Sequence, residues 1–239
     1  MWLTLQTSTY IFELLQLNED MMYFEDRTHA GRLLAAQLID KYRYNGCTVV
    51  ALSDGGVVVG EEIAAQLQCA LMMIVSEDIE IPGEGISFGG VSHGGEFTYN
   101  SELSEGEIYQ YTSEFHGYLS EKRREAFQRI NRLIGDKGTI DKDLLRDRVV
   151  ILVSDGFGDD ASIDVALTFL KPLRINRLVV AAPVATVPAV DRLHVAADEL
   201  HILDVKANYL GVNHYYERND IPSHDETIAR INEIMTRWQ

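Results

Sequence analysis

Five apolar segments of strand length recur along the chain, separated by segments whose apolar residues have helical spacing. The strand-like segments lie at residues 48–52, 70–75, 149–153, 177–182 and 199–203. The helical segments lie at residues 30–44, 57–68, 161–170, 189–196 and 223–238. Continuous apolar strands joined by helices are typical of a parallel sheet covered on both faces. We therefore predict an α/β fold with a central parallel sheet flanked by helices.

The segment 77–142 departs from this alternation, and we interpret it as an insertion. Its first part is rich in glycine, and short alternating pieces at residues 86–88 and 96–99 predict a small hairpin. Ser104 with Glu107 three residues later is a capping-box signal, and it opens a long polar helix from about residue 105 to residue 134. A Tyr/Phe stripe on this helix has two interpretations: packing against its own domain, or the contact of a homo-oligomer.

The length and the linkers indicate how these parts are organised. The 239 residues are ample for one core, and no long Pro/Ser/Gly tract divides them. We predict a single domain over residues 1–239, with the insertion at 77–142. Apolar residues between Tyr10 and Leu17 suit a short amphipathic helix, so residues 1–22 are predicted to form a helical extension.

Charge and cysteine content narrow the classes of partner. The formal net charge is -16, which disfavours nucleic-acid binding through released counterions. No apolar run approaches the roughly 20 residues of a membrane span, so we expect no membrane partner. The two cysteines, Cys47 and Cys69, cannot form a disulfide framework. We expect a cytoplasmic protein with a small-molecule ligand, and we expect it to form a homo-oligomer.

The turns after Leu52 and Val153 are where a ligand is expected, because parallel α/β sheets bind ligands at the carboxyl ends of their strands. Residues 149–162 read as a buried strand, a glycine turn and the start of a helix. Such a turn can present backbone amides to a phosphate. It can equally be a plain tight turn whose glycines serve only the backbone conformation.

A series of short motifs runs from about Tyr23 to Asn219 and covers most of the chain. The motifs are Phe24-x-Asp26-Arg27-x-x-Ala30-Gly31-x-x-Leu34-Ala35, Ser53–Gly56, Pro82-Gly83, Gly89-Gly90-Val91, Asn100, Glu121 with Arg124, Val153–Ser162, Val180–Ala185 and Tyr215-Tyr216. In their order, these motifs resemble those of the type I phosphoribosyltransferases, in particular a bacterial group of predicted ones. The resemblance implies transfer of ribose 5-phosphate from phosphoribosyl pyrophosphate (PRPP) to a nucleophile, usually a nucleobase, with Mg²⁺ on the pyrophosphate.

The resemblance also implies where the site residues lie. The ligand loop falls on Ser154, Asp155, Gly156, Phe157, Gly158, Asp159, Asp160, Ala161 and Ser162, with Asp155 as the catalytic acid. The equivalent of the pyrophosphate loop is Ser53, Asp54, Gly55 and Gly56, and Ser76-Glu77 stands where the family has Arg-Lys after its second strand.

This chain departs from the family pattern at four places. Asp159-Asp160 replaces a Thr-Gly that receives the phosphate, Asp54 replaces an arginine, and Ser76-Glu77 replaces a basic pair. The adjacent acid pair becomes Ser154-Asp155, which leaves one acid. An unfavourable carboxylate–phosphate contact near 4 Å costs roughly 4 kcal/mol per unit charge at an effective dielectric constant of 20.

Three hypotheses follow from the resemblance and its departures. The first, which we favour, is a phosphoribosyltransferase-like protein that no longer binds PRPP and serves as a binding or assembly protein, or takes a cationic or neutral ligand. The second is an active enzyme in which Mg²⁺ bridges Asp159, Asp160 or Asp54 to the phosphates. The third is a divalent-cation site formed by Asp155, Asp159 and Asp160 with Asp54 or Glu77; acidic loops that simply face water are its plain alternative.

Overall fold

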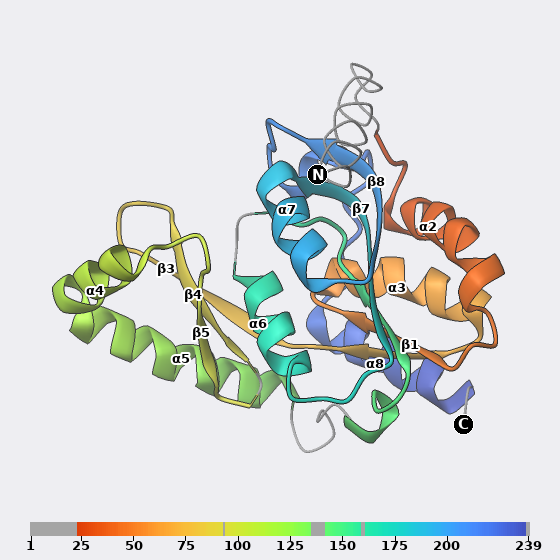
Figure 1. The fold of residues 1–239 in the computed structure, drawn as a ribbon, viewed down its shortest axis with the longest axis horizontal. Helices are drawn as coiled ribbons and strands as arrows, with labels where there is room; N and C mark the ends of the chain where they lie inside the picture. The colour runs from red at the N-terminus through yellow and green to blue at the C-terminus, as the bar shows by residue number, and fades with distance from the viewer. Residues whose placement is uncertain (1–22, 93, 135–141, 159–160, 238–239) are drawn as a thin grey trace, which may run out of the picture.

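The computed structural model describes residues 23–92, 94–134, 142–158 and 161–237. The prediction of a helix at residues 1–22 therefore lies outside the described residues. Five parallel strands form the main sheet in the order β2-β1-β6-β7-β8 (Figure 1). They are β1 (Cys47–Ala51), β2 (Ala70–Met73), β6 (Val149–Val153), β7 (Arg177–Thr186) and β8 (Glu199–Lys206). The predicted parallel sheet is confirmed.

Successive residues of the central strands enter two different cores, which explains why both faces of the sheet are apolar. Val49 and Ile151, which pair across β1 and β6, face one core, whereas their neighbours Val50 and Leu152 face the other. Side chains alternate across a strand, so a strand that is buried on both faces must be apolar at every position.

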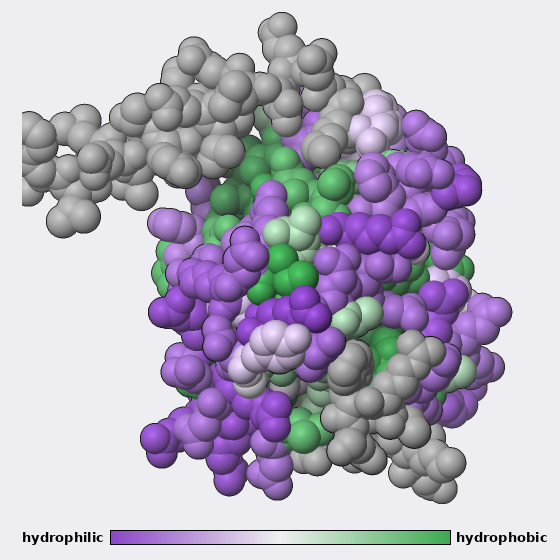
Figure 2. All heavy atoms as spheres, turned by 90° about the vertical axis from the view of Figure 1, so that its right-hand side faces the viewer, coloured by the Kyte–Doolittle hydropathy of each residue, from purple (hydrophilic) through white to green (hydrophobic). Residues whose placement is uncertain are grey.

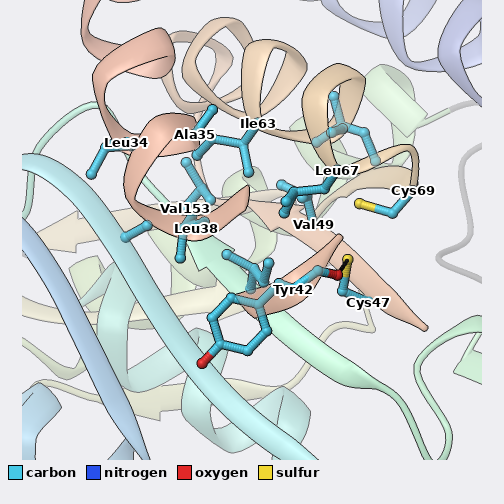
Figure 3. Close-up of a cluster of buried hydrophobic side chains, with 14 of the residues drawn as sticks. Leu34, Ala35, Leu38, Tyr42, Cys47, Val49, Ile63, Leu67, Cys69 and Val153 are labelled. Atoms are coloured by element: carbon cyan, nitrogen blue, oxygen red, sulfur yellow. Dashed lines mark hydrogen bonds between the residues drawn. The ribbon is translucent and has the colours of Figure 1, made fainter. Parts of the chain in front are cut away.

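Helices from different parts of the chain cover the two faces. One face packs against α2 (Arg27–Tyr42), α3 (Asp54–Leu67) and α8 (His224–Arg237), and Figure 3 shows the cluster of side chains there, including the buried Cys47 and Cys69. The other face packs against α6 (Ser162–Leu170) and α7 (Val187–Ala196). Hydrophilic side chains make up most of the surface on the side of the molecule that carries α2 (Figure 2). The covering helices are thus amphipathic, with their apolar sides turned to the sheet.

The predicted insertion forms a second layer of structure beside the sheet. Strands β3 (Ser76–Glu80), β4 (Ser87–Ser92) and β5 (Phe97–Tyr99) make an antiparallel sheet, followed by α4 (Glu105–Glu114) and α5 (His116–Ile134). This part, which we call the hood, lies to the left of the main sheet in Figure 1. Its own core contains Phe88, Leu119 and Ile130. The Tyr/Phe stripe packs largely against this core, with Tyr111 and Phe115 at its border.

Several boundaries differ from the sequence prediction, and three of the differences have a cause in the local structure. The long helix is broken at Phe115, whose backbone leaves the helical region with ψ 21°. Strand β7 continues through Pro183 to Thr186, because Phe157 of the preceding turn donates to Val184 and accepts from Thr186 and so replaces the missing neighbour strand. Helix α3 begins at Asp54 rather than Val57, because Ser53 caps it by accepting from the Gly56 amide at 2.8 Å.

Within the described ranges, we find no helix that is both long enough and apolar enough to cross a membrane.

Candidate functional site

A cavity of about 560 Å³ opens at the carboxyl ends of β1 and β6 and is covered by the hood. Strand β1 pairs with β2 on one side and with β6 on the other, so the strand order reverses here. This is the switch point at which α/β sheets bind their ligands. The lining residues come from five segments: Leu52 and Ser53; Ser76, Glu77, Asp78 and Glu80; Gly85, Ser87 and Gly90; Ser154, Asp155, Gly156, Gly158, Ala161, Ser162 and Val165; and Tyr209, Gly211 and Val212.

The Ser53–Gly56 segment is the start of a helix rather than an open loop. Ser53 lines the cavity and caps α3, whereas Asp54 occupies the first turn and pairs with His224 of α8 at 3.0 Å. A carboxylate at this end of a helix is favourable because the first-turn amides carry a partial positive charge. The structure therefore places the Asp54 carboxylate against α8, and Asp54 does not appear among the described lining residues of the cavity.

The turn after β6 carries the predicted ligand loop. The Ser154 hydroxyl donates to the Gly156 carbonyl at 2.8 Å and accepts from the Gly156 amide at 3.2 Å. Phe157 is buried in the core under α6 and α7. A Cβ atom on Gly156 would lie 2.7 Å from the Val212 side chain and 2.8 Å from the Tyr209 hydroxyl. Close packing of this segment therefore requires glycine, whether or not a ligand is bound.

Asp159 and Asp160 lie outside the described residues, so their predicted part in the site stays a prediction. Ala161 and Ser162, which complete the predicted loop, do line the cavity.

Asp155, the predicted catalytic acid, is buried at the base of the cavity. One carboxylate oxygen accepts from Arg27 Nε at 2.7 Å, and the other accepts from the Ser53 hydroxyl at 2.7 Å. The Asp155 carbonyl accepts from the Tyr216 hydroxyl at 2.5 Å. Burial, and secondly the negative charge of Asp155, raises the pKa of Tyr216, which keeps this hydroxyl a donor. The catalytic role of Asp155 stays a prediction, made on a carboxylate that already has two protein partners.

The hood contributes acidic side chains to the cavity. Ser76 and Glu77, predicted as site residues, do line it, and Glu77 also pairs with Arg129 of α5 at 3.2 Å. Asp78 accepts from the Ser87 hydroxyl at 2.6 Å and from the Ala161 amide at 3.3 Å. Asp78 therefore takes up a backbone donor at the N-terminal end of α6, a place suited to an anion.

Several lining residues were missed by the sequence analysis, among them Asp78, Glu80, Tyr209 and Val212. The acids at positions 78 and 80 alternate along a strand, which places them on one face, but that signal does not say what the face covers. Tyr209 and Val212 come from a turn that carries no recognisable pattern.

The charge of the lining is one-sided. Glu77, Asp78, Glu80 and Asp155 carry carboxylates, while no lysine, arginine or histidine stands among the lining residues that the structure describes. Among the described residues, no three His, Cys, Asp or Glu side chains come together in a way that could hold a metal ion. The cation hypothesis depends on Asp159 and Asp160 as well, so it stays untested.

A parallel sheet in this order, with a cavity at its switch point, defines a doubly wound α/β ligand-binding fold. The crystal structure of the protein TT1426 from Thermus thermophilus is similar: it is 30% identical, with a TM-score of 0.67, over 89% of this chain and 99% of that one. Two curated relatives from Mycobacterium tuberculosis, strains CDC 1551 and H37Rv, carry the name "Putative phosphoribosyl transferase" and are each 26% identical over 213 residues.

The chain belongs to the type I phosphoribosyltransferase-like family. The aligned region is 89% of this chain but 47% of each curated relative, so the chain spans about half the length of those relatives. No family model matches the sequence.

Proposed function

We propose that this protein is a divergent member of its family that does not bind PRPP in the normal way and acts as a binding or assembly protein. Its cavity would take a neutral or cationic small molecule. The observation that carries the proposal is the lining of the cavity, which holds four carboxylates and, among the described residues, no basic side chain. Two of the four, Asp155 and Glu77, pair with arginines that stand outside the lining, whereas Glu80 has no arginine or lysine partner among the ion pairs that the structure describes.

The electrostatic balance supports this proposal. PRPP is a polyanion, and each carboxylate near 4 Å from a phosphate charge costs roughly 4 kcal/mol at an effective dielectric constant of 20. A helix N-terminus stabilises an anion by only about 0.3–1 kcal/mol at an exposed site. Two protein carboxylates already use the helix ends beside the cavity: Asp54 lies in the first turn of α3, and Asp78 accepts from the Ala161 amide of α6.

The first test is isothermal titration calorimetry with PRPP and Mg²⁺. We expect no heat of binding up to millimolar PRPP. Micromolar binding would refute the proposal.

Two variants that each lose three negative charges test whether the acids of the cavity lining exclude anions. The triple variant Glu77→Gln, Asp78→Asn and Glu80→Gln removes three negative charges from the lining. A control triple variant, with Glu105, Glu114 and Glu121 changed to Gln, removes the same charge from exposed positions of α4 and α5. We expect inorganic pyrophosphate to bind at least about tenfold more tightly to the lining variant than to the control, since local repulsion exceeds screened distant repulsion. Equal affinities would mean that the lining acids do not exclude anions.

An active phosphoribosyltransferase is the second candidate, and it is favoured by a cavity that lies at the switch point in a member of this family. In that case, as the sequence predicts, carboxylates of the loop such as those of Asp159 and Asp160 would hold Mg²⁺ against the phosphates of the substrate. Release of pyrophosphate from PRPP with any of the common nucleobases would establish this function and refute the first.

A further inference from the structure

Arg27 is completely buried, and each of its three nitrogen atoms has a partner. Nε donates to Asp155 at 2.7 Å, Nη2 to Asn213 at 2.7 Å, and Nη1 to Asn219 at 3.3 Å. The guanidinium carbon lies 4.3 Å from the centre of the Tyr216 ring. A buried charge is costly unless it is paired and hydrogen-bonded. The ionic partner and the bond from each nitrogen atom therefore tie the position of Arg27 to that of its neighbours.

The partners of Arg27 belong to separate walls of the cavity. Asp155 lines the cavity after β6 and also accepts from Ser53, which lines it after β1. Asn213 and Tyr216 belong to the turn 208–216, whose Tyr209, Gly211 and Val212 form a third wall.

Hydrogen bonds and a ring contact within the turn 208–216 join its two ends, so a contact that fixes one part of the turn also fixes the rest. The Tyr215 hydroxyl donates to the Asn208 carbonyl and accepts from the Leu210 amide, and its ring stacks on Tyr209 with centroids 5.5 Å apart. The backbone of Phe24 also bonds to this turn through Tyr215. Loss of the Arg27 contacts would therefore loosen the turn without detaching it.

Gly55 gives independent evidence that the Arg27–Asp155 pair is built into the site. A Cβ atom on Gly55 would lie 2.1 Å from Asp155 Oδ2 and 2.6 Å from Arg27 Nε. The first turn of α3 thus packs directly on the ion pair, and only glycine leaves room for it.

We infer that Arg27 is a positioning residue of the cavity, which holds the Ser53 turn, the Asp155 turn and the turn 208–216 in one arrangement. Asp155 serves as its counter-ion and is not a free acceptor for a ligand. The inference rests on the proposed function only in taking this cavity as the site, and it assumes no particular ligand. It also explains why a single acid is retained at the end of β6: removing it would leave the buried guanidinium without its ionic partner.

The test is amide hydrogen exchange, followed by mass spectrometry, on the full chain without ligand. In Arg27→Lys the charge stays but the planar fork of donors is lost. We expect exchange in residues 207–219 to accelerate about tenfold or more, as for the loss of a hydrogen bond to a charged group, while residues 179–185 of β7 keep their wild-type rate. The control is Arg32→Lys on the same helix, where an exposed arginine pairs with Glu62; neither segment should change.

Asp155→Asn is the second variant, and it serves if Arg27→Lys does not fold. It keeps the shape of the side chain but removes the counter-ion, so residues 53–56 and 207–219 should both exchange faster. An unchanged rate in residues 207–219 would show that Arg27 does not hold this turn, and a rise equal to that of β7 would show that Arg27 contributes only to global stability; either result would overturn the inference. Because no ligand is present, binding of PRPP would refute the proposed function and leave this result standing.

Discussion

Gly55→Ala is a substitution for which helix propensity and tertiary packing predict opposite changes in stability. Gly55 lies in the first turn of α3, and alanine is the better helix former by about 1 kcal/mol. From helix propensity alone the variant should be more stable. In the structure, the new methyl group would lie 2.1 Å from a carboxylate oxygen of Asp155 and 2.6 Å from Arg27 Nε.

The expected loss of stability follows from the displacement of the Asp155 and Arg27 side chains by the new methyl group. Overpacking a buried site costs about 1–3 kcal/mol, and breaking a buried ion pair costs about 3–5 kcal/mol. The pair is displaced rather than removed, so we expect a net loss of about 2–3 kcal/mol after the gain in propensity. For a chain of this size, that corresponds to a fall in Tm of about 4–12 °C.

Urea denaturation followed by far-UV circular dichroism measures this difference. The matched control is Gly117→Ala near the start of α5, where no heavy atom lies within 4 Å of the added Cβ. We expect the control to gain up to about 1 kcal/mol. If Gly55→Ala were as stable as the wild type, the Arg27–Asp155 ion pair would not be packed against the first turn of α3.

Three further predictions concern other parts of the molecule. Burial raises the pKa of Glu199, but hydrogen bonds from Lys41 first, and then from Tyr42 and His201, lower it to about 2; the stabilisation is present above the ordinary pKa and is lost as the pH falls from about 5 to 2. Between pH 7 and pH 3, the free energy of unfolding measured by urea denaturation should therefore fall by about 1 kcal/mol less in Glu199→Gln than in the wild type. An equal fall in both proteins would contradict the lowered pKa of Glu199. Ile151→Ala, in the centre of the sheet, should cost about 3 kcal/mol in the same assay, and a cost below about 1 kcal/mol would argue against a close-packed core. Ser104→Ala removes the cap of α4, a helix with no buried residue, and should destabilise that helix by about 1 kcal/mol; hydrogen exchange should rise in residues 105–114 and not in β6.

The same glycines support two explanations of the turn after β1. In the family pattern, Gly55 and Gly56 belong to a loop that receives pyrophosphate. Here they also make room for protein groups: Gly55 for the Arg27–Asp155 pair, and Gly56 for the backbone of Val153 and Ser154, which a Cβ would approach to 3.2 Å. Glycine at these positions is therefore no evidence by itself that an anion binds.

The sequence alone determined the architecture of the main sheet. The apolar runs of the two central strands β1 and β6 predict strands that are buried on both faces, because exposure of either face would favour a polar residue at every second position. The edge strand β8 carries Glu199 and His201 and is only partly buried. Periodicity is a local property, so it can be read without knowing which elements meet. The turns after β1 and β6 were also located from sequence, since topology places ligands at strand ends.

Only the tertiary structure decided what the polar residues of those turns do. Arg27 and Asp155 are 128 residues apart, and Asp54 meets a histidine 170 residues further on. The sequence suggested that Asp54 and Glu77 repeat the acidic misfit of Asp159-Asp160 around a ligand, and that Asp155 is a catalytic acid. In the structure Asp54 faces α8 and Asp155 neutralises a buried arginine, and the other acids among the described lining residues come from the hood. The partner of a charged side chain is set by three-dimensional packing, and no periodicity along the chain records it.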